Sequence, residues 1–413
     1  MNYLKISYAL IINLSDAGLK FIFFLMFPIF YSNNFVADFH IYLSLIFISS
    51  IFLKLAYEGL LLKKMTDFET SINEIKIYLK KIFVNLSKSY LLFILVIFFF
   101  LYFENYLNNY YFFKVLKSLY INIIISSFCY SIIFILSYGL RALNQTNLSL
   151  IFLGFNWSLP VIIILATFKF LNIEDKYLII NLFTLIYVLI AGLITTVFYI
   201  ILYRFRKKKQ KSHNKQKLDQ SSLYIDSING VFVNWLPILI FGFFNNQEQI
   251  ALFSTQFRIG LGFFTVMNII DYLSFKEISI FFQKKTYSKL IKSFSYYKKI
   301  KIFLSIFLFF GSVFLLVLFN IYFENNYGYL FFIFLFLILS TSIFGPVNIS
   351  YVIFNKEKLL AKINIIFVFK VLILFFIGTS FYNHEISLII FGLLFFSNIY
   401  LKYKYLKLKN YNL

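Results

Sequence analysis

The sequence predicts an all-α polytopic membrane protein with twelve transmembrane helices, arranged as two like-oriented lobes of six helices each. Three observations support this fold class. First, 61% of the 413 residues are apolar and 60 are Phe, which is too hydrophobic for a soluble chain of this length. Second, the apolar residues form runs of about 18 or more, the length that crosses a bilayer. Third, Lys and Arg gather in every second gap between those runs.

Each predicted span follows one apolar run, and a polar or charged gap separates it from the next. In the N-terminal half we expect spans at 6–31, 37–60, 84–103, 118–140, 146–169 and 177–202. In the C-terminal half we expect them at 222–243, 249–273, 302–321, 328–353, 361–381 and 385–403. The first run begins too late and is too long for a cleaved signal peptide, so it counts as a span.

The basic residues predict the orientation, because Lys and Arg in short loops stay on the cytoplasmic side. With the N-terminus inside, 30 of the 39 basic residues fall in cytoplasmic segments. Only four fall outside: Lys114, Lys117, Lys169 and Lys176. Both termini are therefore expected in the cytoplasm. Membrane lipids account for the net charge of +22, and no nucleic-acid partner is expected.

A basic linker at 203–221 divides the chain into an N-terminal lobe, 1–202, and a C-terminal lobe, 222–413. Six spans return each half to its starting side, so an axis along the membrane normal can relate the lobes. The longest cytoplasmic segment of each half follows its second span, at 61–83 and 274–301. Both segments mix Lys with apolar residues at about helical spacing, which favours a location on the membrane surface.

Several function classes lack the residues that they need. The three His and the single Cys, Cys129, are widely separated, so we expect neither a zinc site nor a disulfide. A Gly-rich phosphate loop is missing, so ATP hydrolysis is not expected, and no cofactor is predicted. Short external loops disfavour a membrane glycosyltransferase or polymerase, which is kept as the enzyme alternative. A transporter, not an enzyme, is the class that fits.

Five cations lie inside predicted spans: Lys20, Lys54, Lys88, Arg258 and Lys370. Charges at membrane depth are costly and commonly mark a transport pathway. Lys88 lies about one turn from the cytoplasmic end of its span, so it is expected to reach the headgroups. Lys370 lies in the middle of its span and has no assigned role.

Two of these cations have an acid four residues away on the same helix face: Asp16 with Lys20, and Lys54 with Glu58. Either the pairs neutralise each other so that a charged helix can face the bundle interior, or the cations bind substrate. Asp16, Glu58 and Asp226 are also candidates for ion coupling or charge pairing.

Arg258 is the sharpest candidate, because a guanidinium stays charged and forms bidentate bonds with phosphate or carboxylate. It lies about nine residues, or roughly 14 Å, from the external end of its span. A structural ion pair with Asp16 or Glu58 is the alternative. Asn234 and Trp235 could hydrogen-bond sugar hydroxyls in a water-filled cavity, or they could pack helices together.

Three segments resemble O-antigen flippases of the Wzx type, which are polysaccharide transporters. Residues 234–260, NWLPILIFGFFNNQEQIALFSTQFRIG, are similar to the helix 7 to helix 8 region of that family, with a Trp-Leu-Pro stretch and an Arg-bearing helix. Residues 345–365, GPVNISYVIFNKEKLLAKINI, resemble the turn between helices 10 and 11. Residues 137–149, SYGLRALNQTNLS, resemble the turn between helices 4 and 5.

This resemblance implies the fold of the multidrug/oligosaccharidyl-lipid/polysaccharide (MOP) exporter superfamily, a MATE-like pair of lobes around a central cavity. It implies a flippase that turns oligosaccharide repeat units on undecaprenyl diphosphate from the cytoplasmic to the periplasmic leaflet of the bacterial inner membrane. Related flippases hold the lipid diphosphate with cations on helices 1, 2 and 8, where this sequence has Lys20, Lys54 and Arg258.

A polysaccharide polymerase and a chain-length regulator are the protein partners that the resemblance implies. Within the same superfamily, the alternative is a drug/cation antiporter, for which an acidic cavity is expected. The cations within the predicted spans, Lys20, Lys54 and Arg258 among them, argue against that alternative. A purely structural scaffold has no reason to carry Lys20 and Arg258 at membrane depth.

Overall fold

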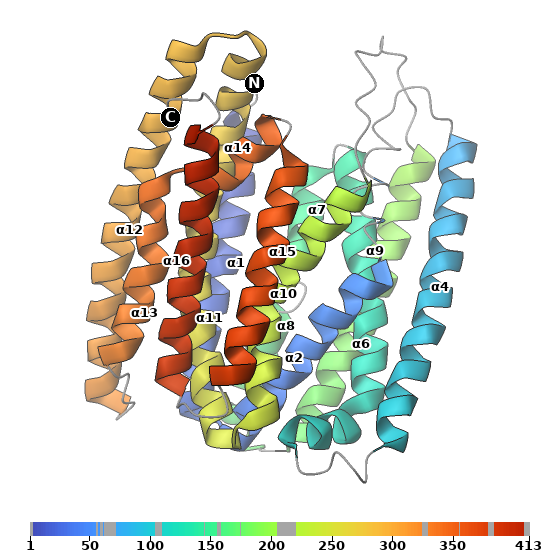
Figure 1. Cartoon of the computed structure of the whole chain (residues 1–413). Helices are drawn as coiled ribbons and strands as arrows, with labels where there is room; N and C mark the ends of the chain where they lie inside the picture. The colour runs from blue at the N-terminus through green and yellow to red at the C-terminus, as the bar shows by residue number, and fades with distance from the viewer. Residues whose placement is uncertain are drawn as a thin grey trace. The chain divides into compact units, whose positions relative to one another are not determined.

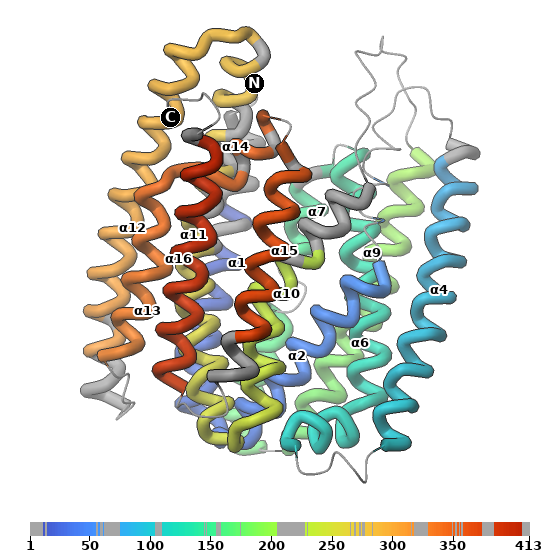
Figure 2. The backbone as a smooth tube through the Cα atoms, viewed as in Figure 1, coloured from blue at the N-terminus to red at the C-terminus, as the bar shows by residue number. Residues whose placement is uncertain are grey.

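The computed structural model describes residues 3–54, 57, 61, 72–103, 110–143, 145–154, 158–173, 175–204, 220–323, 329–354, 356–378 and 384–408. The regular elements within these ranges are helices (Figures 1 and 2). They divide into two compact units: Met1–Phe23 with Phe35–Phe243, and Phe24–Asn34 with Phe244–Leu413. The linker predicted at 203–221 falls mainly on 205–219, outside the described residues, so the lobe boundary there stays a prediction.

The first unit is built from eight helices of the described residues. They are α1 (Tyr3–Phe30, whose end lies in the second unit), α2 (Asn33–Lys54), α4 (Ile72–Tyr102), α6 (Tyr111–Ala142), α7 (Thr146–Gly154), α8 (Ser158–Phe170), α9 (Lys176–Arg204) and α10 (Gln220–Phe244). Helix α2 is buried along most of its length and α6 packs most extensively against α9. At Gly139 of α6 an added Cβ would lie 2.5 Å from the Phe198 ring, so the glycine permits that close approach.

The second unit contains the remaining helices. They are α11 (Gln247–Gln283), α12 (Tyr287–Phe323), α13 (Tyr329–Ser340), the 3₁₀ turn η1 (Thr341–Phe344), α14 (Val347–Ile353), α15 (Glu357–Gly378) and α16 (His384–Leu408). Its core is aromatic: Phe257 of α11 contacts Phe391 of α16, with ring centroids 4.7 Å apart. Helix α11 contacts α12, α13, α14 and α16, and α16 contacts α11, α13, α14 and α15.

Five helices of the described residues are long and apolar enough to cross a membrane, and a sixth counts if the bent pair α7 and α8 is one span. The five are Asn33–Lys54, Ile75–Tyr102, Tyr111–Ala142, Lys176–Arg204 and His384–Leu406. The expectation of an all-helical chain with several membrane spans is confirmed, whereas the number twelve stays a prediction.

Two spans predicted as continuous helices are interrupted. The helix expected at 146–169 is α7 and α8, which meet at 47°; Pro160 has no N–H to donate and lies in the first turn of α8, where proline is tolerated. The helix expected at 328–353 is α13, η1 and α14, broken at Gly345 and Pro346. Gly345 has φ +73°, a conformation that glycine adopts without strain.

The segment at 274–301, predicted to lie on the membrane surface, is the continuation of two long helices, and its location stays a prediction. Helix α11 runs on to Gln283 and α12 begins at Tyr287, so only a short turn separates them (Figure 1). No Gly or Pro occurs between 274 and 301 to stop either helix. At the turn, Lys285 adopts φ +55° and Thr286 N–H donates to Phe281 O at 3.0 Å, a Schellman end to α11.

Candidate functional site

Lys54 is the most deeply buried of the sequence-predicted site residues in the first unit. It lies in the last turn of α2, with 3% of its surface exposed. Its ammonium nitrogen lies 3.5 Å from the ring centroid of Phe134 on α6, a cation–π contact. Its predicted partner Glu58 lies outside the described residues, so the Lys54 and Glu58 pair is untested.

Lys20 and Asp16 form the ion pair that their spacing on α1 allows. The Lys20 Nζ lies 2.5 Å from Asp16 Oδ2, and the Ser158 hydroxyl of α8 donates to Asp16 Oδ1 at 2.9 Å. The structure thus displays the charge-neutralising alternative for this pair. A role of Lys20 in substrate binding stays a prediction, in which a phosphate would compete with Asp16 for the ammonium.

Asn234 and Trp235 of α10 contact groups of the first unit. The Asn234 side chain donates to the Gly230 carbonyl at 2.6 Å, within its own helix. Trp235 is buried and stacks on Phe47 of α2, with centroids 4.2 Å apart. The Trp235 contact packs α10 against α2, whereas the Asn234 bond lies within α10, and sugar recognition by these residues stays a prediction. Asp226 lies in α10, but its side chain is not among those described.

Arg258 is buried in α11 of the second unit, with 6% of its surface exposed. The residues before it, Thr255 and Gln256, are buried as well, and the Gln256 Oε1 has no hydrogen-bond partner within the described residues. Burying a permanent charge costs free energy, so the buried position of Arg258 indicates a structural or functional role. The predicted site residues therefore fall on both units: Arg258 on the second, the others described on the first.

The remaining two cations of the predicted spans are exposed. Lys88 lies on the exposed side of α4. Lys370 is exposed on α15 beside Ile366, Phe369 and Ile373, which are each more than half exposed. Neither belongs to a buried charge cluster in the described part of the chain.

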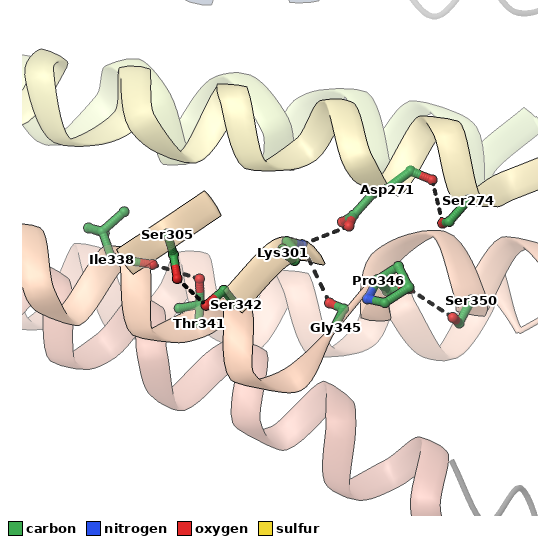
Figure 3. A network of polar contacts seen from close by, with 10 residues as sticks. All are labelled: Asp271, Ser274, Lys301, Ser305, Ile338, Thr341, Ser342, Gly345, Pro346 and Ser350. Carbon is green, nitrogen blue, oxygen red and sulfur yellow. Dashed lines mark hydrogen bonds and ion pairs between the residues drawn. The ribbon is translucent and has the colours of Figure 1, made fainter. Parts of the chain in front are cut away.

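A polar network in the second unit was not expected from the sequence (Figure 3). Lys301 of α12 pairs with Asp271 of α11 at 2.7 Å, and the two side chains are only 5% and 6% exposed. The same ammonium donates to the Gly345 carbonyl at 3.4 Å, and Ser305 bonds Ser342 at 2.8 Å. The network therefore ties the interrupted stretch between α13 and α14 to α11 and α12.

A second unexpected cluster joins three helix starts of the first unit. Lys176 of α9, predicted as a loop cation, lies 2.7 Å from the buried Asp38 of α2. Tyr111 of α6 donates a hydrogen bond to the other Asp38 oxygen. The signal for both clusters was an acid beside an apolar run, Asp38 and Asp271, but nothing in the sequence identifies the distant partners.

Arg141 was also counted as a loop cation, yet it lies in the last turn of α6. Its guanidinium carbon lies 4.8 Å from the ring centroid of Tyr138. Among the described residues, no three His, Cys, Asp or Glu side chains gather closely enough to hold a metal ion.

Comparison with known proteins gives a fold and no sequence relative. No family model matches the sequence, and no curated protein matches it. Among solved structures, an inward-facing multidrug resistance MATE family transporter of the MOP superfamily superposes with a TM-score of 0.61 at 11% identity, covering 97% of this chain and 98% of that one.

Two further structures agree at lower similarity. A MATE protein in complex with MaL6 has a TM-score of 0.50 at 11% identity over 98% of this chain and 92% of its own. The MATE multidrug transporter DinF-BH, solved as a complex, has a TM-score of 0.50 at 14% identity over 98% of this chain and 94% of its own. This chain has the fold of these MATE transporters. With its apolar helices, that fold makes it a multi-pass membrane protein.

Proposed function

We propose that this MATE-fold protein is a flippase for anionic lipid-linked sugars, namely oligosaccharide repeat units on undecaprenyl diphosphate destined for O-antigen or a related surface polysaccharide. It would move them from the cytoplasmic to the periplasmic leaflet of the bacterial inner membrane. The observation that carries the proposal is the sign of the charge buried in the fold, since the MATE fold itself is also the fold of multidrug transporters.

Buried cations outnumber buried acids among the described side chains. The cations are Lys54, Arg258, Lys301 and Lys402, and the acids are Asp38 and Asp271. Each acid is bound to a lysine, Asp38 to Lys176 and Asp271 to Lys301, so neither carboxylate is left to attract a cationic cargo. A surplus of positive charge in a low-dielectric interior favours an anion.

A lipid diphosphate fits that surplus. It carries one to two negative charges beside large polar sugars, and moving such a group through hydrocarbon without partners costs many kcal/mol. Arg258 offers the planar, always-charged fork that binds phosphate oxygens in pairs, and Lys54 and Lys20 add point charges. The prenyl tail can stay in the membrane while the headgroup crosses.

The proposed cycle is alternating access. With both termini in the cytoplasm, the headgroup binds from the cytoplasmic side and leaves on the periplasmic side as the helices rearrange. An inside-negative potential favours outward movement of an anion by about 2.3 kcal/mol per charge per 100 mV. Asp16 is a candidate for ion coupling because it is already paired with a cation that the substrate would compete for. A polysaccharide polymerase and a chain-length regulator are proposed partners on the product side.

Drug/cation antiport is the second candidate, because the three similar structures are MATE proteins and two of them are named as multidrug transporters. It predicts that acids, rather than cations, dominate the buried charge. The described residues have the opposite balance.

The deciding experiment deletes the gene and extracts lipid-linked sugars from the cells. We expect repeat units to accumulate on the cytoplasmic side while surface polysaccharide is lost, with complementation by the wild type. Arg258→Ala should fail to complement and Arg258→Lys should complement in part. Lys88→Ala, which removes an exposed cation, is the matched control and should complement fully.

Two results would count against the flippase. Unchanged surface polysaccharide without accumulated intermediates would refute it outright. If the deletion strain instead became hypersensitive to cationic dyes, the antiporter would be the better account. Full complementation by Arg258→Ala at normal expression would remove Arg258 from the proposed site but leave the function standing.

A further inference from the structure

Arg141 stands at the end of a row of four side chains in the first unit, in which two stacked aromatic rings lie between two cations. The Lys54 ammonium lies 3.5 Å from the Phe134 centroid, and the Phe134 and Tyr138 rings stack with centroids 5.2 Å apart. The Arg141 guanidinium carbon lies 4.8 Å from the Tyr138 centroid. We call these four residues, Lys54, Phe134, Tyr138 and Arg141, the cation-aromatic ladder.

The helical repeat of α6 builds most of this ladder. Phe134, Tyr138 and Arg141 are spaced by four and three residues, so they follow one face of the helix. Lys54 joins from the last turn of α2, which is buried against the rest of the unit. The three contacts keep the two charges within about 14 Å of each other.

The guanidinium of Arg141 has unused hydrogen-bonding capacity. Its Nε is buried, yet it has no hydrogen-bond partner among the described residues. The guanidinium lies over the Tyr138 ring, a contact that provides no hydrogen-bond acceptor for its five N–H donors. The Arg141 side chain as a whole is only partly buried, so a ligand can reach it. A guanidinium that contacts a ring, and whose buried Nε has no partner among the described residues, retains donors that phosphate oxygens can accept from.

We propose that Arg141 is the first protein contact for the phosphate-bearing head of the substrate, which it delivers along the ladder toward Lys54. The inference rests on the proposed function and adds a residue and a direction to it. On the predicted topology, Arg141 is at the cytoplasmic end of α6, the side where lipid-linked sugars are loaded. The ligand class is a prenyl diphosphate; an anionic phospholipid headgroup offers similar oxygens, so the experiment must separate the two.

Binding to purified protein in detergent tests the proposal, with farnesyl diphosphate as the probe and farnesol and phosphatidylglycerol as comparators. The variants are Arg141→Gln, Arg141→Lys, Tyr138→Phe and Tyr138→Leu. Arg204→Gln is the matched control, because Arg204 lies in the last turn of α9 as Arg141 lies in the last turn of α6, is exposed, and carries the same charge. Thermal unfolding of each variant, measured alongside, checks that the protein is folded.

We expect wild-type protein to bind farnesyl diphosphate saturably and Arg141→Gln to bind about tenfold more weakly or worse. Arg141→Lys should lose less, Tyr138→Leu should weaken binding while Tyr138→Phe does not, and Arg204→Gln should match the wild type. Equal affinity of Arg141→Gln and wild type would overturn the inference and leave the flippase standing. Equal competition by phosphatidylglycerol would also overturn it. Failure of the wild type to bind any diphosphate would refute the proposed function itself.

Discussion

The buried pair of Asp271 and Lys301 makes the strongest quantitative prediction about stability. Lys301→Met removes the ammonium while keeping most of the side-chain volume, so it isolates the loss of charge. The Asp271 carboxylate is then left 6% exposed without its ion-pair partner, and the Gly345 carbonyl loses the bond from Lys301 at the interrupted helix. The substitution therefore loosens α11, α12 and the stretch between α13 and α14 together.

The expected cost follows from the burial of both partners. Removing one member of a buried ion pair typically costs about 3–5 kcal/mol, because the remaining charge stays uncompensated. Replacing both members with apolar residues of similar size is often close to neutral. We therefore expect Lys301→Met and Asp271→Leu each to lower the free energy of unfolding by about 3 kcal/mol or more. The double variant Lys301→Met with Asp271→Leu should lose much less than the sum.

The assay is a double-mutant cycle on purified protein, with unfolding followed in detergent by denaturant titration and by thermal melting. Lys299→Met is the matched control, because Lys299 lies two residues away on α12 and is exposed. A surface substitution of this kind should stay within about 0.5 kcal/mol of the wild type.

Two outcomes would refute the reasoning. If Lys301→Met costs no more than Lys299→Met, the pair does not hold the unit together. If the single-variant losses simply add in the double variant, the two side chains are not energetically coupled, whatever their 2.7 Å separation.

Three further predictions concern glycine contacts, buried tyrosine hydroxyls and the pH dependence of melting. Gly260→Ala should destabilise the protein by about 1–3 kcal/mol, because the added Cβ meets the buried Phe334 ring. Gly262→Ala, whose added Cβ has nothing within 4 Å, should stabilise the protein by up to about 1 kcal/mol. Thermal melting curves distinguish the two variants. Tyr42→Phe should lower the free energy of unfolding by about 1–2 kcal/mol, because the Tyr42 hydroxyl bonds Ser126 at 2.8 Å and Thr184 at 3.0 Å. Tyr187→Phe should be neutral or stabilising, because the Tyr187 hydroxyl is buried without a partner among the described residues. A loss of stability in Tyr187→Phe as large as that in Tyr42→Phe would contradict this. Burial, with the bond to Glu277, raises the pKa of Tyr297 from 10.0 to about 12, so the protonated form is favoured in the folded state. The resulting stabilisation should be complete below pH 10 and lost between about pH 10 and 12. Tyr297→Phe should remove that part of the pH dependence of the melting temperature.

Hydropathy and periodicity predicted the helices well, because both signals are local. For example, the apolar run at 177–202 was sufficient to predict α9 to within a few residues of both observed ends. The interruption at Gly345 and Pro346 carried a local signal too, since glycine and proline punctuate helices. The extent of α11 and α12 had a different cause: helices continue past the apolar stretch when no residue stops them, and hydropathy reports only where the membrane-compatible part ends.

The charged residues show where a local rule fails. Counting cations in loops correctly left Lys54 and Arg258 as buried charges. The same count assigned Arg141, Lys176 and Lys301 to loops, because each lies at the edge of an apolar run. Whether an edge residue reaches solvent or folds back onto a neighbour depends on tertiary packing, which brings Lys301 to an acid 30 residues away and Lys176 to one 138 residues away.

These edge cations change how the positive charge of the chain is understood. Topology explains a lysine that water or headgroups can solvate, but it gives no reason to bury one or to fix its orientation. Lys301 and Lys176 are accounted for by the carboxylates that they neutralise. Arg141 is held by a ring that supplies no hydrogen-bond acceptor to its buried Nε. Lys301 and Lys176 are neutralised by carboxylates of the same chain, whereas the buried Nε of Arg141 has no acceptor among the described residues. For this reason we expect an anionic ligand at Arg141.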